Sequence, residues 1–184
     1  MTVSKEEIVD FNDADEVEEG YPKVASGPYL ARATESTVGV SKASGNPMVE
    51  YTPVLLESSN DDDPTQDKNG LEIKNFKLPK DRIILFANPV YSRGPNEGKV
   101  KDAATLAKDN KTAMGKARGI VRKMTGEDFT PKGTRVEVAQ ELANAIKGAT
   151  FVAVVSLQPE QKEKGFPAKN VVREHKAEED WQGA

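Results

Sequence analysis

The chain contains no cysteine and only one histidine among its 184 residues. Without cysteine it has no disulfide framework, no thiol nucleophile and no thiolate metal site. His175 stands beside an acidic segment, and a Ser-His-Asp arrangement or a His-rich metal site would rest on this one residue, which we expect to be exposed. We therefore predict no catalytic site, no metal and no other cofactor.

Long apolar runs are also missing. No stretch of about 18 consecutive apolar residues occurs, which argues against a membrane-spanning helix. The first 20 residues are acidic and lack the apolar centre of a signal peptide. We expect a soluble protein of the cytoplasm that has no membrane partner.

Hydrophobic residues are scarce at 36%, and charged residues reach 30%, so part of the chain should be solvated rather than packed. The length fits one domain with appendages. We predict an acidic leader over residues 1–20, a folded domain over 21–176 and an acidic tail over 177–184. The leader and the tail are expected to be disordered.

The acidic residues are concentrated in three segments. Residues 1–20, 57–68 and 174–184 hold 17 of the 30 acidic residues but only three of the 26 basic ones, which leaves 13 acidic and 23 basic residues elsewhere. A basic body favours a polyanionic partner, and acidic segments can compete with that partner for the same surface. The alternative is that the charge runs only keep the protein in solution.

Short apolar segments bounded by turn residues predict three or four strands, a helical stretch and then two strands. The strands are expected near residues 29–34, 48–56, 82–87, 150–158 and 169–176, and the segment 71–89 offers one strand or two. Between the third and fourth strands, two segments have helical periodicity, residues 100–124 and 136–147. This order is typical of an OB-fold, a five-stranded, partly open barrel. We predict a mainly β fold of this kind, with the helices between strands three and four, while α+β alternatives stay open.

Some details of these elements can also be predicted. In the second strand, Val49, Tyr51, Pro53 and Leu55 share one face, and Pro53 should mark an edge, a bulge or an early end because it cannot donate to a ladder. In the first helix, Gly115 and Gly119 should weaken the helix and could split it. One face of that helix is expected to carry its apolar side chains, Ala103, Leu106, Ala113, Met114, Ala117 and Val121.

Basic residues alternate with aromatic ones in three places: KNFK at 74–77, VYSR at 90–93 and KEKGFPAKNVVR at 162–173. Proteins bind single strands by stacking bases on aromatic rings, at about 1–3 kcal/mol per base, while Lys and Arg follow the phosphates. For each ring, a place in the core or in a loop anchor is an equal alternative. The candidate phosphate contacts are Arg32, Lys42, Lys77, Arg93, Lys99, Lys169 and Arg173, and the candidate stacking rings are Phe76, Tyr91 and Phe166.

Two hairpins resemble those of phage-encoded single-stranded DNA-binding proteins. The first hairpin has Gly27 and Tyr29 at the start of a strand, the turn residues Ser41 and Lys42, and then Gly-Asn-Pro-Met at 45–48. The second has FVAVVSL, KEKGFPAKN and VVREH in that order near the end. The resemblance extends over about residues 25–176, but the acidic insertion at 57–68 and the long helical stretch at 99–147 depart from the simple pattern.

The resemblance implies an OB-type barrel that coats single-stranded DNA during phage replication, recombination or repair, in the host cytoplasm. By the same likeness, the acidic tail would bind replication or recombination proteins through Glu178, Glu179, Asp180 and Trp181, although this chain ends in WQGA. The alternative function is a protein-interaction adaptor that uses the same barrel and binds no nucleic acid itself. A nuclease or other enzyme is a more distant alternative.

Overall fold

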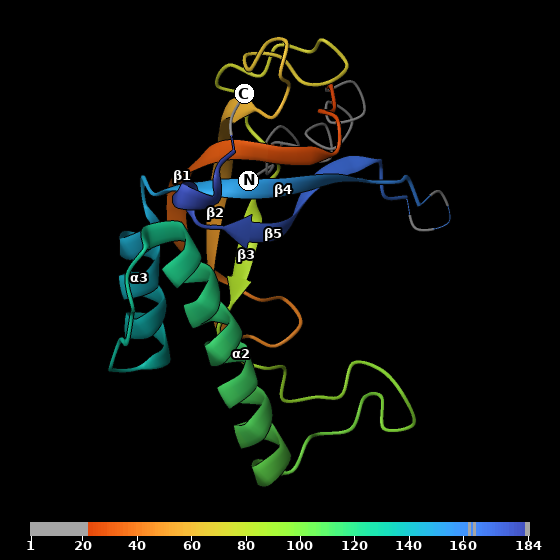
Figure 1. Cartoon of the computed structure of the whole chain (residues 1–184). Helices are drawn as coiled ribbons and strands as arrows, with labels where there is room; N and C mark the ends of the chain where they lie inside the picture. Colours follow the sequence, from red (N-terminus) through yellow and green to blue (C-terminus); the bar gives the residue numbers. More distant parts are fainter. Residues whose placement is uncertain (1–21, 162, 164, 183–184) are drawn as a thin grey trace, which may run out of the picture.

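The computed structural model describes residues 22–161, 163 and 165–182 (Figure 1). The expected acidic leader, residues 1–20, lies outside them. Three strands, two helices and two strands follow in the predicted order. They are β1 (Gly27–Val40), β2 (Pro47–Ser58), β3 (Asp81–Ile84), α2 (Ala103–Thr125), α3 (Arg135–Ile146), β4 (Thr150–Gln158) and β5 (Lys169–Lys176), after which a short 3-10 turn, η3, spans Glu178–Asp180.

The five strands form one antiparallel sheet in the order β3-β2-β1-β4-β5. The long strand β1 is shared, because it pairs with β2 over most of its length and with β4 over Gly27–Arg32. Two register shifts interrupt its pairing with β2, and Glu35 has a φ of 50° at the second of them. Such bulges bend and twist a strand, which lets the sheet curl. The predicted mainly β, OB-like barrel with a helical insertion is confirmed.

The barrel is nearly closed, and side chains bridge the seam between its edge strands, β3 and β5. Tyr51 Oη donates to Asp81 Oδ2 at 2.8 Å and lies 2.6 Å from His175 Nε2, which is itself 3.1 Å from Asp81 Oδ2. The His175 ring stacks on Phe151 with 5.4 Å between the ring centroids. One buried cluster therefore joins β2, β3, β4 and β5.

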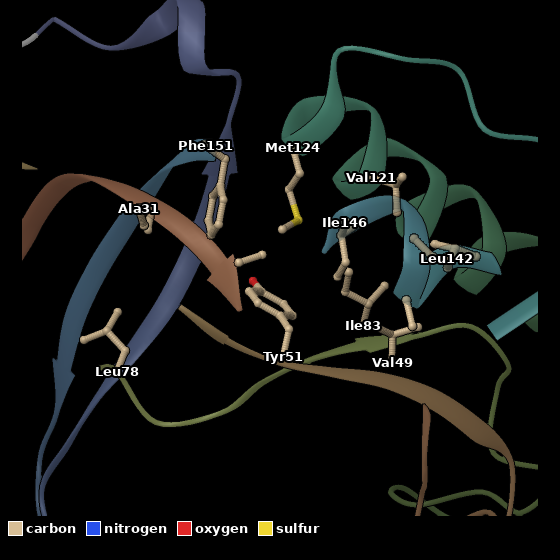
Figure 2. Packing of buried hydrophobic residues seen from close by; sticks show 14 of the residues in the cluster. Ala31, Val49, Tyr51, Leu78, Ile83, Val121, Met124, Leu142, Ile146 and Phe151 are labelled. Atoms are coloured by element: carbon tan, nitrogen blue, oxygen red, sulfur yellow. The ribbon is translucent and has the colours of Figure 1, made fainter. Parts of the chain in front are cut away.

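The core fills the barrel and continues under the helices. Figure 2 shows Val49 and Tyr51 of β2 pointing toward Val121 and Met124 of α2 and Ile146 of α3. The face of β2 that carries Val49, Tyr51, Pro53 and Leu55 is buried throughout. The β2–β3 ladder ends at the pair Tyr51 and Asp81, two residues before Pro53, as expected for a residue without an N–H donor.

Both helices carry capping residues that explain where they begin. The Asp102 side chain accepts a hydrogen bond from Thr105 N at 2.8 Å, and Thr134 and Glu137 form a reciprocal capping box. Helix α2 ends at Gly126, whose φ of 74° favours glycine. Neither helix is both long and apolar enough to cross a bilayer, in the part of the chain that the structure describes.

Helix α2 differs from the sequence prediction in two respects. It continues without a break through Gly115 and Gly119. Only its C-terminal half is buried, through Ala117, Val121 and Met124, whereas Ala103 and Met114 are exposed. The reason is length: 23 residues extend about 35 Å, and Figure 1 shows the N-terminal half projecting beyond the barrel.

The acidic loop after β2 is held together by Asp67, which is fully buried. Its carboxylate accepts hydrogen bonds from three backbone N–H groups, those of Ala25 at 2.7 Å, Asn69 at 2.8 Å and Leu71 at 2.9 Å. Burial, together with the charge of Asp67, raises the pKa of Tyr29 to about 12. The Tyr29 hydroxyl therefore stays protonated and donates to Ala25 O at 2.7 Å.

Candidate nucleic-acid interface

The β1–β2 turn presents Lys42 to solvent. Two backbone bonds close the turn, from Ser41 N to Asn46 O at 2.9 Å and from Gly45 N to Ser41 O at 2.8 Å. Gly45 adopts a φ of 67°, which a β-branched residue would resist. The Gly-Asn-Pro sequence thus forms a tight turn with a cation at its tip.

Asn46 is the buried anchor of this turn, a role that its sequence position did not reveal. Its Nδ2 donates to Ala87 O at 2.9 Å, and its Oδ1 accepts from Arg135 Nη1 at 2.6 Å. The Arg135 guanidinium in turn lies 5.0 Å from the centroid of the Phe86 ring. The turn is therefore fixed to the segment after β3 and to the start of α3.

Lys42→Glu is expected to weaken binding to oligo-dT and to lower the slope of log affinity against log salt by about 0.7 or more, because one phosphate contact is lost. Lys132→Glu is the matched control, since Lys132 is an exposed lysine in the α2–α3 connection. Salt titrations of both variants make the measurement. Equal slopes for the two variants would show that Lys42 does not contact the bound strand.

The connection between β3 and α2 carries the candidates Tyr91, Arg93 and Lys99. Backbone bonds between Tyr91 and the residues Gly98 and Lys99 close it into a narrow loop. Arg93 and Lys99 are exposed, whereas the Tyr91 ring is half-buried with Lys101 Nζ 5.5 Å from its centroid. The two cations are open to a ligand, and the ring also anchors the loop.

The connection between β4 and β5 displays Phe166, whose exposed fraction is 59%. Phe166 pairs with Gln161 through two backbone bonds of 2.8 and 3.3 Å, which orient the tip of the loop. Lys169, at the start of β5, is exposed, and Arg173 Nε donates to Ser156 Oγ at 2.9 Å on the outer face of the sheet. This loop combines an exposed ring with nearby cations.

Three predicted contacts lie away from these loops. Phe76 packs against the core, which favours its alternative role as a core side chain. Lys77 pairs with Glu35 at 2.8 Å, and this hydrogen bond is the main cause of the lowered pKa of Glu35. Arg32 is exposed in β1, opposite Val54 and Thr150. These three side chains therefore lie apart from the loops that carry the other candidates.

The expectation that His175 is an exposed surface residue is wrong. Its exposed fraction is 9%, and it lies inside the barrel seam against Tyr51 and Asp81. Burial and the nearby Asp81 raise the pKa of Tyr51 far above its usual value. For Asp81, burial acts in the opposite direction, but hydrogen bonds from His175 and Tyr51 outweigh it and lower the pKa.

Disorder was expected from residue 177, and the structure describes residues 177–182 with defined contacts. Glu178–Asp180 form the turn η3, and Trp181 N donates to Glu178 O at 2.9 Å. Trp181 Nε1 donates to Glu57 Oε2 at 3.2 Å, which ties the segment to β2. Glu178 and Glu179 line a groove of about 800 Å³ together with Arg122 and Lys123 of α2. The proposed partner-binding residues thus pack on the barrel.

Sequence reasoning did not assign a binding role to α2. The helix has six basic residues and one acidic residue, Asp109. Asp109 is itself paired with Lys101 at 2.7 Å, while Arg118 and Arg122 approach Asp128 at 3.5 and 4.0 Å. Its basic side chains at positions 108, 111, 116 and 123 form no ion pair with any described residue.

Comparison with known proteins gives no family assignment. No protein-family model matches the chain, and no curated protein matches it significantly. Within the described residues, no group of three or more His, Asp or Glu side chains is placed to hold a metal ion.

Proposed function

We propose that this chain binds single-stranded DNA without sequence preference, as a coating protein of phage replication, recombination or repair. The observation that carries this proposal is the exposed Phe166 ring on the β4–β5 loop of an OB-like barrel, with the exposed cation Lys169 at the start of the strand that follows. An aromatic face accepts any base, and nearby cations accept any phosphate, which gives binding without base readout. A buried ring would have no face available to a base.

The arrangement of the loops supports the proposal. In OB-folds, the loops after strands one and four border the ligand face beside strands two and three. Here these loops carry Lys42 and Phe166, and the connection after β3 adds Arg93 and Lys99. The β1–β2 turn lies at the Val40 end of β1, where Asn46 contacts Arg135 of α3, and the β4–β5 loop lies toward the Gly27 end, where β4 pairs with β1 (Figure 1). A strand that runs along β1 between these loops would meet Lys42 at one end and the Phe166 ring, followed by Lys169, at the other.

The acidic segments support the same arrangement by their position. Trp181 joins the C-terminal segment to Glu57, where the acidic loop begins. Glu57 lies opposite Leu30, near the start of β1, whereas the β1–β2 turn follows Val40 at the other end of that strand. Lys42 is therefore separated from this acidic segment, which reduces the repulsion that a polyanion would meet at the turn.

The full chain should bind oligo-dT more tightly than duplex DNA of equal length. Its log affinity should fall with log salt at a slope of about −0.7 for each phosphate contacted, so several contacts give a steep line. Fluorescence anisotropy over a range of salt concentrations measures both quantities. A slope near zero would show that the chain does not bind through phosphate contacts.

The adaptor function remains the second candidate, because the acidic surface around Glu57 and Glu178–Asp180 is ordered and exposed. Such a surface fits a basic protein partner. If the chain binds neither oligo-dT nor duplex at low salt, the adaptor function replaces the first proposal.

A further inference from the structure

A groove of about 460 Å³ lies between β3 and α2. Arg82, Ile84 and Ala87 line one side of it, and Lys116 and Ile120 line part of the helix side. The exposed fraction of Ile84 is 47%, although its neighbours in sequence are almost fully buried, because side chains alternate along the strand. The groove therefore has apolar walls open to solvent.

The charges around the groove favour an anionic ligand. Lys116 has no ion-pair partner among the described residues. Arg82 donates to Glu50 only through Nε, at 2.9 Å, and a guanidinium has four further N–H donors. The one carboxylate that lines the groove, Asp109, is paired with Lys101 at 2.7 Å. Cations thus exceed free carboxylates along the groove.

The groove also lies next to the β1–β2 turn. Ala87, which lines the groove, accepts the hydrogen bond from Asn46 Nδ2 at 2.9 Å. Lys42 stands in the same turn as Asn46. A ligand that contacts Lys42 can therefore continue into the groove without crossing the acidic loop.

We propose that the groove between β3 and α2 is a second contact site for single-stranded DNA, in which Lys116 and Arg82 bind a phosphate and Ile84 and Ile120 pack against a base. This site rests on the proposed function and extends it, because it adds α2 to the path of the strand. Aliphatic side chains accept the face of any base, so the site is independent of sequence.

The helix itself provides a matched control. Lys111 and Lys116 are both exposed lysines of α2 without an ion pair to a described residue. Five residues apart, they point in directions that differ by about 140° around the helix axis. Only Lys116 lines the groove. Lys111→Gln and Lys116→Gln therefore remove the same charge from the same helix at different sides.

The experiment measures binding of the full chain to oligo-dT of about 4 and about 16 nucleotides, the two ends of the range that one OB-fold covers. For the longer oligo, Lys116→Gln should lower the salt slope by about 0.7, so its affinity deficit shrinks about 2.6-fold when salt rises fourfold. Lys111→Gln should match the wild type, and Lys116→Arg should restore binding. The shorter oligo, held by the loops, should bind all variants equally.

Ile84→Ala tests the base contact separately. It should weaken binding of the longer oligo severalfold at every salt concentration and leave the thermal melting curve unchanged, because Ile84 is largely outside the core.

The outcomes separate the two proposals. If the wild type binds but Lys116→Gln and Lys111→Gln behave alike, the groove is not a contact site, whereas the proposed function stands. Equal loss in both variants would mean that α2 attracts the strand only through its overall charge, and would overturn the site. If the wild type binds neither oligo at low salt, both proposals are wrong.

Discussion

Asp81→Ala should lower the free energy of unfolding by about 1–3 kcal/mol at neutral pH, the cost of depriving buried polar groups of a hydrogen-bond partner. Asp81 accepts from Tyr51 Oη at 2.8 Å and lies 3.1 Å from His175 Nε2. These contacts are the bridge between β3 and β5, which have no shared backbone ladder among the described strands. Without Asp81, the seam should open more easily.

The pH dependence follows from the lowered pKa of Asp81, for which hydrogen bonds outweigh the opposing effect of burial. A carboxyl whose pKa is lower in the folded state stabilises the fold above its unfolded value, 3.8 here. That stabilisation is lost as the pH falls through the lower folded value. The difference between the wild type and Asp81→Ala should therefore be greatest above pH 3.8 and shrink below it.

Urea unfolding at neutral and acidic pH measures this difference. Asp61→Ala is the control, because Asp61 is an exposed aspartate of the acidic loop. It should leave the free energy of unfolding nearly unchanged at both pH values. Equal stability of Asp81→Ala and the wild type at neutral pH would show that the seam does not depend on this cluster.

The barrel could be predicted from the sequence because its signals are local. Alternation along β2 placed Val49, Tyr51, Pro53 and Leu55 on one face, and all four are buried. Apolar periodicity within single segments predicted both helices. The burial of His175 could not be predicted in this way, because it depends on Tyr51, 124 positions earlier, and on Asp81, 94 positions earlier. Neighbouring acidic residues made His175 resemble a surface residue.

In the candidate site, too, features set by local sequence could be predicted and features set by distant contacts could not. Lys42 and Phe166 were identified from turn residues and local composition, and both are exposed. The roles of Asn46 and Lys116 depend on contacts between distant segments, from Asn46 to Arg135 and from β3 to α2. Phe76 packs against the core with part of its ring, and a ring between lysines looks the same in sequence whether it faces a base or the core.

Phe166→Ala should weaken binding to oligo-dT by about 1–3 kcal/mol, or about 5- to 160-fold, if its ring stacks on a base. The melting temperature should stay within error of the wild type, because more than half of the side chain is exposed, 59%. Phe166→Trp should retain the affinity, since a larger ring keeps the stacking face. Anisotropy titrations and thermal melts provide the two readouts.

Leu157→Ala is the control for this prediction. Leu157 is also apolar and exposed, at 46%, and lies in β4 opposite Asn170 near the same end of the hairpin. It has no aromatic face, so its truncation should leave the affinity unchanged. If Leu157→Ala and Phe166→Ala weaken binding equally, the hairpin contributes apolar surface rather than stacking. If Phe166→Ala instead lowers the melting temperature and leaves the affinity unchanged, the ring anchors the loop, and the observation that carries the proposed function is lost.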